Sequence, residues 1–144
     1  MEELLIRYLH FLAILSLASG LMVEQFLISK KVSSTEMNKI ASADALCGVA
    51  VLLIIVTGTL LWFFYGKPAE FYSENRVFYI KLIVFAVLIV LAIYPATFFI
   101  RNRNSHSNSI TIPQNVIFLI KAELVLLITM PLLAVFMARG YGHN

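Results

Sequence analysis

The sequence has little of what soluble, metal-binding or disulfide-rich proteins need. Its 144 residues include one cysteine, Cys47, which excludes an intrachain disulfide framework and any cysteine-based zinc or iron–sulfur site. Charged residues make up only 13% of the chain, about half of the ~25% typical of soluble domains. This shortage of charge excludes a typical soluble enzyme, an intrinsically disordered chain and a nucleic-acid-binding module.

Familiar catalytic signatures are also missing. The chain contains no Gly-rich phosphate loop, no H-E-x-x-H sequence and no G-x-S-x-G sequence. Its Ser and Thr residues stand in no recognisable triad context. The sequence therefore assigns no catalytic residue and no metal site.

Long apolar runs are what the sequence has in abundance. Hydrophobic residues make up 60% of the chain, and the mean hydropathy is +0.89. A bilayer core of ~30 Å needs about 20 helical residues, and four runs meet that length, at 4–28, 44–65, 77–100 and 116–138. The polar connections are short, so neighbouring helices are expected to be antiparallel. We predict an all-α integral membrane protein in which residues 1–144 form one transmembrane four-helix bundle.

The Lys and Arg residues near the span ends predict the orientation, because cytoplasmic loops carry an excess of them. The first and third connections carry Lys30, Lys31, Lys39, Arg101 and Arg103, and the opposite side carries Arg7, Lys67, Arg76 and Arg139. This small bias favours the first and third connections in the cytoplasm, with both termini on the opposite side of the membrane. The acidic start differs from the basic start of a signal peptide, so we expect the first span to be retained.

One face of the first span gathers polar and small residues. Because small residues let another helix approach and polar residues avoid lipid, this face should point into the bundle. Its members recur at spacings of three, four or seven residues and are Arg7, His10, Leu17, Gly20 and Glu24, with Ala13 on the same face. The matching face predicted for the second span consists of Asp44, Gly48, Val51, Ile55, Gly58, Trp62 and Tyr65.

Four charged residues are expected at similar depth near the first connection. Glu24 ends the first helix there and Asp44 begins the second. Lys121 and Glu123 lie roughly one to two turns into the fourth helix. We predict that the four form an intramembrane polar cluster with a net acidic balance. Two other interpretations stay open, namely Asp44 as a helix N-cap and Glu24 paired with Lys121 as a structural tie.

A second set of residues is expected toward the opposite side. His10 lies near the start of the first helix, Trp62 near the end of the second, and Tyr79 and Lys81 near the start of the third. With Arg7, they form a site for a planar or anionic ligand, in which His10 supplies a ring nitrogen and Lys81 a cation. Plainer interpretations also apply: cations that reach lipid phosphates, rings of the interfacial aromatic belt, and a histidine that only hydrogen-bonds.

Several segments together show the pattern of a known family. They are residues 7–13 (RYLHFLA), Glu24, residues 43–44 before Gly48, residues 58–67 (GTLLWFFYGK), residues 71–72, Asn75, Phe78, Lys81 and residues 94–97. Their order and spacing resemble the DUF2214 family of predicted bacterial four-span membrane proteins. The resemblance covers about the first two thirds of the chain. It implies a bacterial inner-membrane protein and supplies no activity.

His10, Tyr79 and Lys81 carry a more remote resemblance. A histidine early in the first span and a His-x-Lys pair at the start of the third are shared by membrane haem proteins around the HemJ-type protoporphyrinogen oxidases and the CopD copper-resistance domain. Here His10 and Lys81 match, but Tyr79 stands in place of the second histidine. The resemblance implies a haem, and the departure leaves open a five-coordinate haem, a tyrosine partner or no haem.

Three functional hypotheses remain. In the first, the chain is an accessory subunit or a structural protein in the lipid bilayer. Its polar residues would only fix helix register, beside a second copy or a partner membrane subunit. In the second, it is a redox protein that binds haem b or a quinone near His10 and Lys81. In the third, Glu24, Asp44 and Glu123 form the proton- or cation-responsive site of a transporter or sensor, which would require dimerisation. No nucleic-acid partner is expected.

Overall fold

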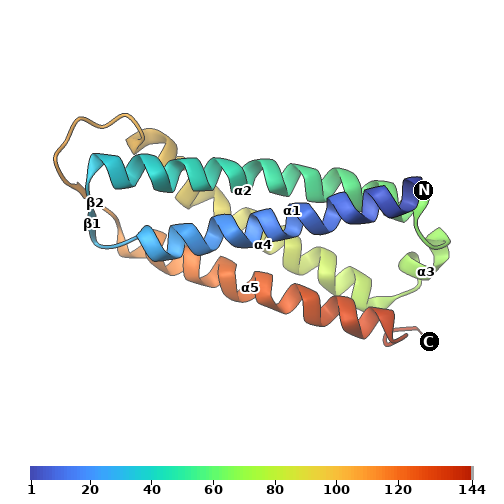
Figure 1. Cartoon of the computed structure of the whole chain (residues 1–144). Coiled ribbons are helices and arrows are strands. Elements are labelled where there is room, and N and C mark those ends of the chain that lie inside the picture. The colour runs from blue at the N-terminus through green and yellow to red at the C-terminus, as the bar shows by residue number, and fades with distance from the viewer. Residues whose placement is uncertain (144) are drawn as a thin grey trace.

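The protein is built from four long helices, as a computed structural model that describes residues 1–143 shows (Figure 1). All four are long and apolar enough to cross a membrane, which confirms the predicted all-α membrane bundle. In chain order the elements are α1 (Glu2–Leu27), β1 (Lys31–Val32), α2 (Ser34–Leu60), the π-helical turn η1 (Leu61–Tyr65), α3 (Ala69–Ser73), α4 (Arg76–Asn102), β2 (Ile110–Thr111) and α5 (Gln114–Ala138).

Consecutive long helices run antiparallel, as predicted (Figure 1). One end of the bundle, here called the strand end, holds β1 and β2, and the other, the terminal end, holds both chain termini and α3. Helix α1 packs most extensively against α2, and α4 packs most extensively against α5. Smaller contacts join α1 to α5 and α2 to α4. The bundle is therefore two helical hairpins closed into a ring in the order α1, α2, α4, α5.

Helix α2 begins well before the predicted start at residue 44. A capping box fixes its first turn, in which Ser33 Oγ accepts from the Glu36 backbone N–H at 3.2 Å and Glu36 Oε2 accepts from the Ser33 N–H at 2.7 Å. Asp44 lies about three turns further on, so the interpretation of Asp44 as an N-cap is wrong. Residues 34–43 are therefore part of the helix and not a loop, with Met37, Ile40 and Ala41 buried.

The strand end has an apolar core of its own. Lys31 pairs with Thr111 and Val32 with Ile110 in a short antiparallel ladder, which the sequence pattern does not predict. The side chains of Val32 and Ile110 are buried with those of neighbouring helix ends, namely Met37, Ile40 and Ala41 of α2, Phe99 of α4, and Val116, Ile117 and Ile120 of α5. This packing joins the first and third connections and holds the helix ends at fixed positions.

A second apolar core lies further along the bundle, where α1 and α2 meet most closely. It contains Ala13, Leu17 and Leu21 of α1, Cys47, Ala50 and Ile54 of α2, and Leu88 and Leu127 of α4 and α5. A Cβ added to Gly20 would overlap Cys47 Sγ, so glycine is what allows this approach. The buried positions of α1 confirm the predicted packing face of the first span, and Cys47 packs in the same core.

The packing face predicted for the second span is wrong by one residue. The buried residues of α2 on this side are Ala43, Cys47, Ala50, Ile54 and Thr57. Gly48 and Ile55 of the predicted face are exposed, and a Cβ added to Gly48 would meet no atom within 4 Å. Neighbouring positions differ by about 100° around a helix, and both faces carry small residues. The composition of α2 alone therefore does not select its contact face.

Candidate functional site

Three acidic side chains from three helices gather between the strand end and the middle of the bundle. Glu24 of α1 and Glu123 of α5 are almost fully buried, with 1% and 4% of their surface exposed. Asp44 of α2 is half-buried. Both Asp44 and Glu123 lie within electrostatic reach of Glu24. The structure thus brings together the three predicted carboxyl groups, here called the carboxyl cluster.

The carboxyl cluster has few internal hydrogen bonds. Cys47 Sγ donates to Glu24 Oε1 at 3.5 Å and also lies 3.8 Å from the Leu17 carbonyl oxygen. Glu123 Oε1 is buried and has no hydrogen-bond partner within residues 1–143. A buried oxygen of this kind costs free energy unless it gains a proton, a water molecule or a cation. The carboxyl cluster is therefore chemically incomplete as a set of protein groups.

Lys121 does not join the carboxyl cluster. It is exposed on α5, while Glu123 faces the interior. Side chains two positions apart on a helix point in directions about 200° apart around its axis. Lys121 and Glu123 therefore cannot both point inward. Across residues 1–143 the one side-chain salt bridge joins Arg7 to Glu3, at 2.7 Å. The predicted ion pair between Glu24 and Lys121 is therefore not formed, and the cluster is wholly acidic.

Nearer the terminal end, His10 of α1 makes one defined contact with α2. Its Nδ1 lies 2.8 Å from Thr57 Oγ1, whose own hydroxyl donates to the Leu53 carbonyl. Because a hydroxyl has one hydrogen to donate, we assign the ring proton to Nδ1, from which it is donated to Thr57. The lone pair of Nε2 is then free to accept a hydrogen bond or bind a metal.

Lys81 of α4 lies within electrostatic reach of His10, as predicted. Gly58 makes room for the ring, because a Cβ there would stand 3.3 Å from His10 Cε1. The other predicted partners are placed differently. Arg7 is bound to Glu3, and 45% of the surface of Tyr79 is exposed. Tyr79 and Lys81 are two residues apart, so the helix directs them to different sides.

Trp62 belongs to an aromatic group around α3. Its ring contacts Phe78 edge-on at 4.8 Å between centroids, and its Nε1 donates to Ser73 Oγ at 3.3 Å. It stands in η1, a single π-helical turn of a rare kind that continues α2. Of the four predicted ligand-binding residues, only His10 and Lys81 are thus shown to lie near each other.

The profile of the DUF2214 family, described as a predicted membrane protein, matches residues 2–142. The chain belongs to the DUF2214 family. Membership extends the predicted resemblance from the first two thirds to nearly the whole chain and agrees with a multi-pass membrane protein. No curated protein and no solved structure matches the chain. The resemblance to membrane haem proteins stays a prediction.

Two contributors to the sites of this DUF2214 protein are not evident as functional residues in the sequence. Thr57 accepts the hydrogen bond of His10, and Cys47 donates to Glu24. Both lie on the buried face of α2, one position from the face that the residue pattern favours. The available signal is their spacing of ten residues, which places two weakly polar side chains near one helix face.

Proposed function

We propose that Glu24, Asp44 and Glu123 bind protons and make this DUF2214 protein a proton-responsive membrane protein. The observation that carries the proposal is the buried, unpartnered oxygen of Glu123 beside two further carboxyl groups. No Lys or Arg side chain of residues 1–143 is paired with these three carboxyl groups, since Lys121 is exposed and the one side-chain salt bridge of residues 1–143 lies elsewhere. Protons are the smallest ligands that complete the carboxyl cluster.

Electrostatics explains why protonation would matter to the fold. Charges repel one another strongly in a medium of low dielectric constant, so neighbouring buried carboxylates are costly unless some of them are neutral. The three groups come from α1, α2 and α5, and the contact between α1 and α5 is much smaller than that between α1 and α2. Loss of protons would therefore act mainly on the α1–α5 contact.

The position of the carboxyl cluster indicates from which side of the membrane it would take up protons. The cluster lies toward the strand end, which carries Lys30, Lys31 and Lys39. The positive-inside rule assigns that end to the cytoplasm of a bacterial inner membrane. The protein would then respond to cytoplasmic pH. A transport role would need a second copy or a partner subunit, because one four-helix bundle offers a single narrow interior.

Infrared spectroscopy of the protein in liposomes tests the proposal. Protonated carboxyl groups have a carbonyl band separate from that of carboxylates, and this band should weaken as the pH is raised. Glu24→Gln and Glu123→Gln should each remove part of it, whereas Lys121→Gln, on the same helix as Glu123 and exposed, should leave it unchanged. A band that is absent at all pH values, or unaffected in both Gln variants, would favour the structural-subunit hypothesis.

A second candidate function, redox chemistry at His10, is supported by the ring tautomer. The hydrogen bond from Nδ1 to Thr57 leaves Nε2 able to bind one haem iron or to accept from a hydroquinone. The residues fit one axial ligand, but exposed Tyr79 does not fit as a second. Absorption spectra of the oxidised and reduced protein test this candidate. A Soret band weakened in His10→Ala supports haem binding, and a flat visible spectrum rejects haem and leaves a quinone as the one redox ligand to test.

A further inference from the structure

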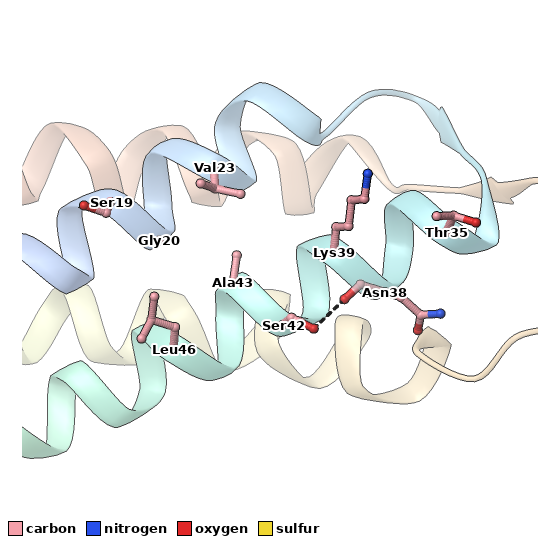
Figure 2. Close-up of a pocket in the computed structure, with 9 residues that line it drawn as sticks. All are labelled: Ser19, Gly20, Val23, Thr35, Asn38, Lys39, Ser42, Ala43 and Leu46. Atoms are coloured by element: carbon pink, nitrogen blue, oxygen red, sulfur yellow. Dashed lines mark hydrogen bonds between the residues drawn. The ribbon is translucent and has the colours of Figure 1, made fainter.

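A groove of about 570 Å³ runs along the outer surface between α1 and α2 (Figure 2). Ala43 and Leu46 are directed from α2 toward α1, where Val23 stands opposite them. Lys39 extends across the same gap nearer the connection between the two helices. The lining surface is mostly apolar, although Ser19, Thr35, Asn38 and Ser42 also line the groove, and a cation stands at one end.

Small residues keep the groove open. Ser19 and Gly20 of α1 and Ala43 of α2 line it, and none has a side chain large enough to fill the space. Gly20 also approaches Cys47 closely, but none of Glu24, Asp44 and Glu123 lines the groove. The groove therefore opens outward, toward the surroundings of the bundle, and is distinct from the carboxyl cluster.

The length of the second span places the groove across the boundary of the membrane. Residues Ser34–Tyr65 form 32 helical residues, which extend ~48 Å, against ~30 Å for the hydrocarbon core. The aromatic residues of η1 mark the opposite boundary. The first three turns of α2 then lie outside the hydrocarbon. Lys39 stands at the level of the lipid headgroups, and Leu46, about 10 Å further along α2, stands among the acyl chains.

The charge around this end of the groove is positive and is not neutralised by a salt bridge within residues 1–143. Lys39 is exposed and takes no part in a salt bridge with residues 1–143. Lys30 and Lys31 are exposed at the same end. The nearest acidic residue along α2, Glu36, accepts from the Ser33 backbone in the capping box. An anion at headgroup level would therefore meet an unpaired ammonium group.

We propose that this groove binds one anionic phospholipid, with its phosphate at Lys39 and an acyl chain along Val23 and Leu46. A phospholipid is complementary to the groove, because its anionic phosphate would meet Lys39 and its hydrocarbon chain would meet the apolar lining. Electrostatic attraction to Lys39 selects an anionic headgroup over a zwitterionic one. The inference does not depend on the protonation of the carboxyl cluster.

Native mass spectrometry of the full chain in mild detergent tests the proposal. Dioleoylphosphatidylglycerol and dioleoylphosphatidylcholine are added separately, and bound lipids are counted at each concentration. The unaltered protein should retain one phosphatidylglycerol more tightly than phosphatidylcholine. Lys39→Gln should lower the affinity for phosphatidylglycerol about fivefold, since one Lys near the surface supplies an attraction of that size. Lys121→Gln, an exposed lysine toward the same end, is the matched control and should have no effect.

A second variant tests the apolar part of the groove. Val23→Phe places a larger side chain on an exposed position and should reduce retention of both lipids. Thermal melts followed by circular dichroism check that both variants stay folded. Equal retention of the two lipids, unchanged binding in Lys39→Gln and Val23→Phe, binding of inorganic phosphate that accounts for the whole Lys39 effect, or a lipid-free dimer with the groove covered would each overturn the proposal.

Discussion

The two halves of the bundle treat their buried polar groups in different ways. Toward the strand end, α1, α2 and α5 bring three acidic groups together, and Glu123 Oε1 has no partner within residues 1–143. Toward the terminal end, α1, α2 and α4 meet around His10, whose Nδ1 is satisfied by Thr57. The first arrangement leaves a buried carboxyl oxygen that the proposed proton binding would satisfy, whereas in the second the assigned tautomer gives Nδ1 a partner and leaves the Nε2 lone pair available.

The same face of α1 carries both arrangements. Glu24 and His10 are separated by 14 positions, which is nearly four turns and ~21 Å along the helix. Both contact the buried face of α2, through Cys47 and Thr57. The difference between the halves therefore comes from the third helix, which supplies another carboxyl group from α5 or an ammonium group from α4.

The largest expected effect concerns how closely α1 and α2 approach beside the carboxyl cluster. Gly20→Leu forces its side chain into Cys47 and the Ala43 backbone, so it should destabilise the protein by about 3 kcal/mol. Gly48→Leu, at an open position of α2, should change stability by no more than about 0.5 kcal/mol. Thermal melts in detergent measure both. Equal losses would show that α1 and α2 are not packed through Gly20.

The next prediction concerns the pH dependence of the strand-end half. Ionised carboxylates repel one another inside the bundle, so the melting temperature should fall as the pH rises. The double variant Glu24→Gln and Glu123→Gln should lose most of this dependence, a difference on the order of 2 kcal/mol at alkaline pH. His10→Gln should leave the alkaline part of the curve unchanged. A flat curve for the unaltered protein would contradict the proposed proton binding.

The terminal-end half should respond to the loss of one hydrogen bond. Thr57→Val removes the acceptor of His10 Nδ1 and should cost about 1–2 kcal/mol. Thr59→Val is the control, because that hydroxyl bonds only within its own helix, to the Ile55 carbonyl at 2.7 Å. Nitrogen NMR of the His10 ring should show the proton on Nδ1. A proton on Nε2 would refute the assigned tautomer.

The smallest expected effect is at the surface. Arg7→Gln removes an exposed pair one turn apart, and such pairs stabilise a protein by less than about 0.5 kcal/mol. Lys121→Gln should be equally mild, because its ammonium group is not part of the carboxyl cluster. Melts at low and high salt measure both changes. A fall of several degrees in the melting temperature of Lys121→Gln would instead support the predicted ion pair between Lys121 and Glu24.

Features that depend on one helix at a time could be predicted. Hydropathy located the four spans, and the spacing of Ala13, Leu17, Gly20 and Glu24 identified the buried face of α1. The start of α2 was harder to predict, because polar residues outside the membrane form a helix as readily as a loop. The pairing of β1 with β2 joins residues about 80 positions apart, and no local pattern reports such a contact.

Hydropathy and short connections depend on local composition, so they predicted the membrane environment, the antiparallel order and the candidate carboxyl residues. Which face of α2 meets α1, the outward direction of Lys121 and the bond between Thr57 and His10 depend on how the helices pack. The physical reason is that α2 carries small residues on two adjacent faces. Which face is buried depends on the shape of the partner helix, and Gly20 of α1 fits against Cys47.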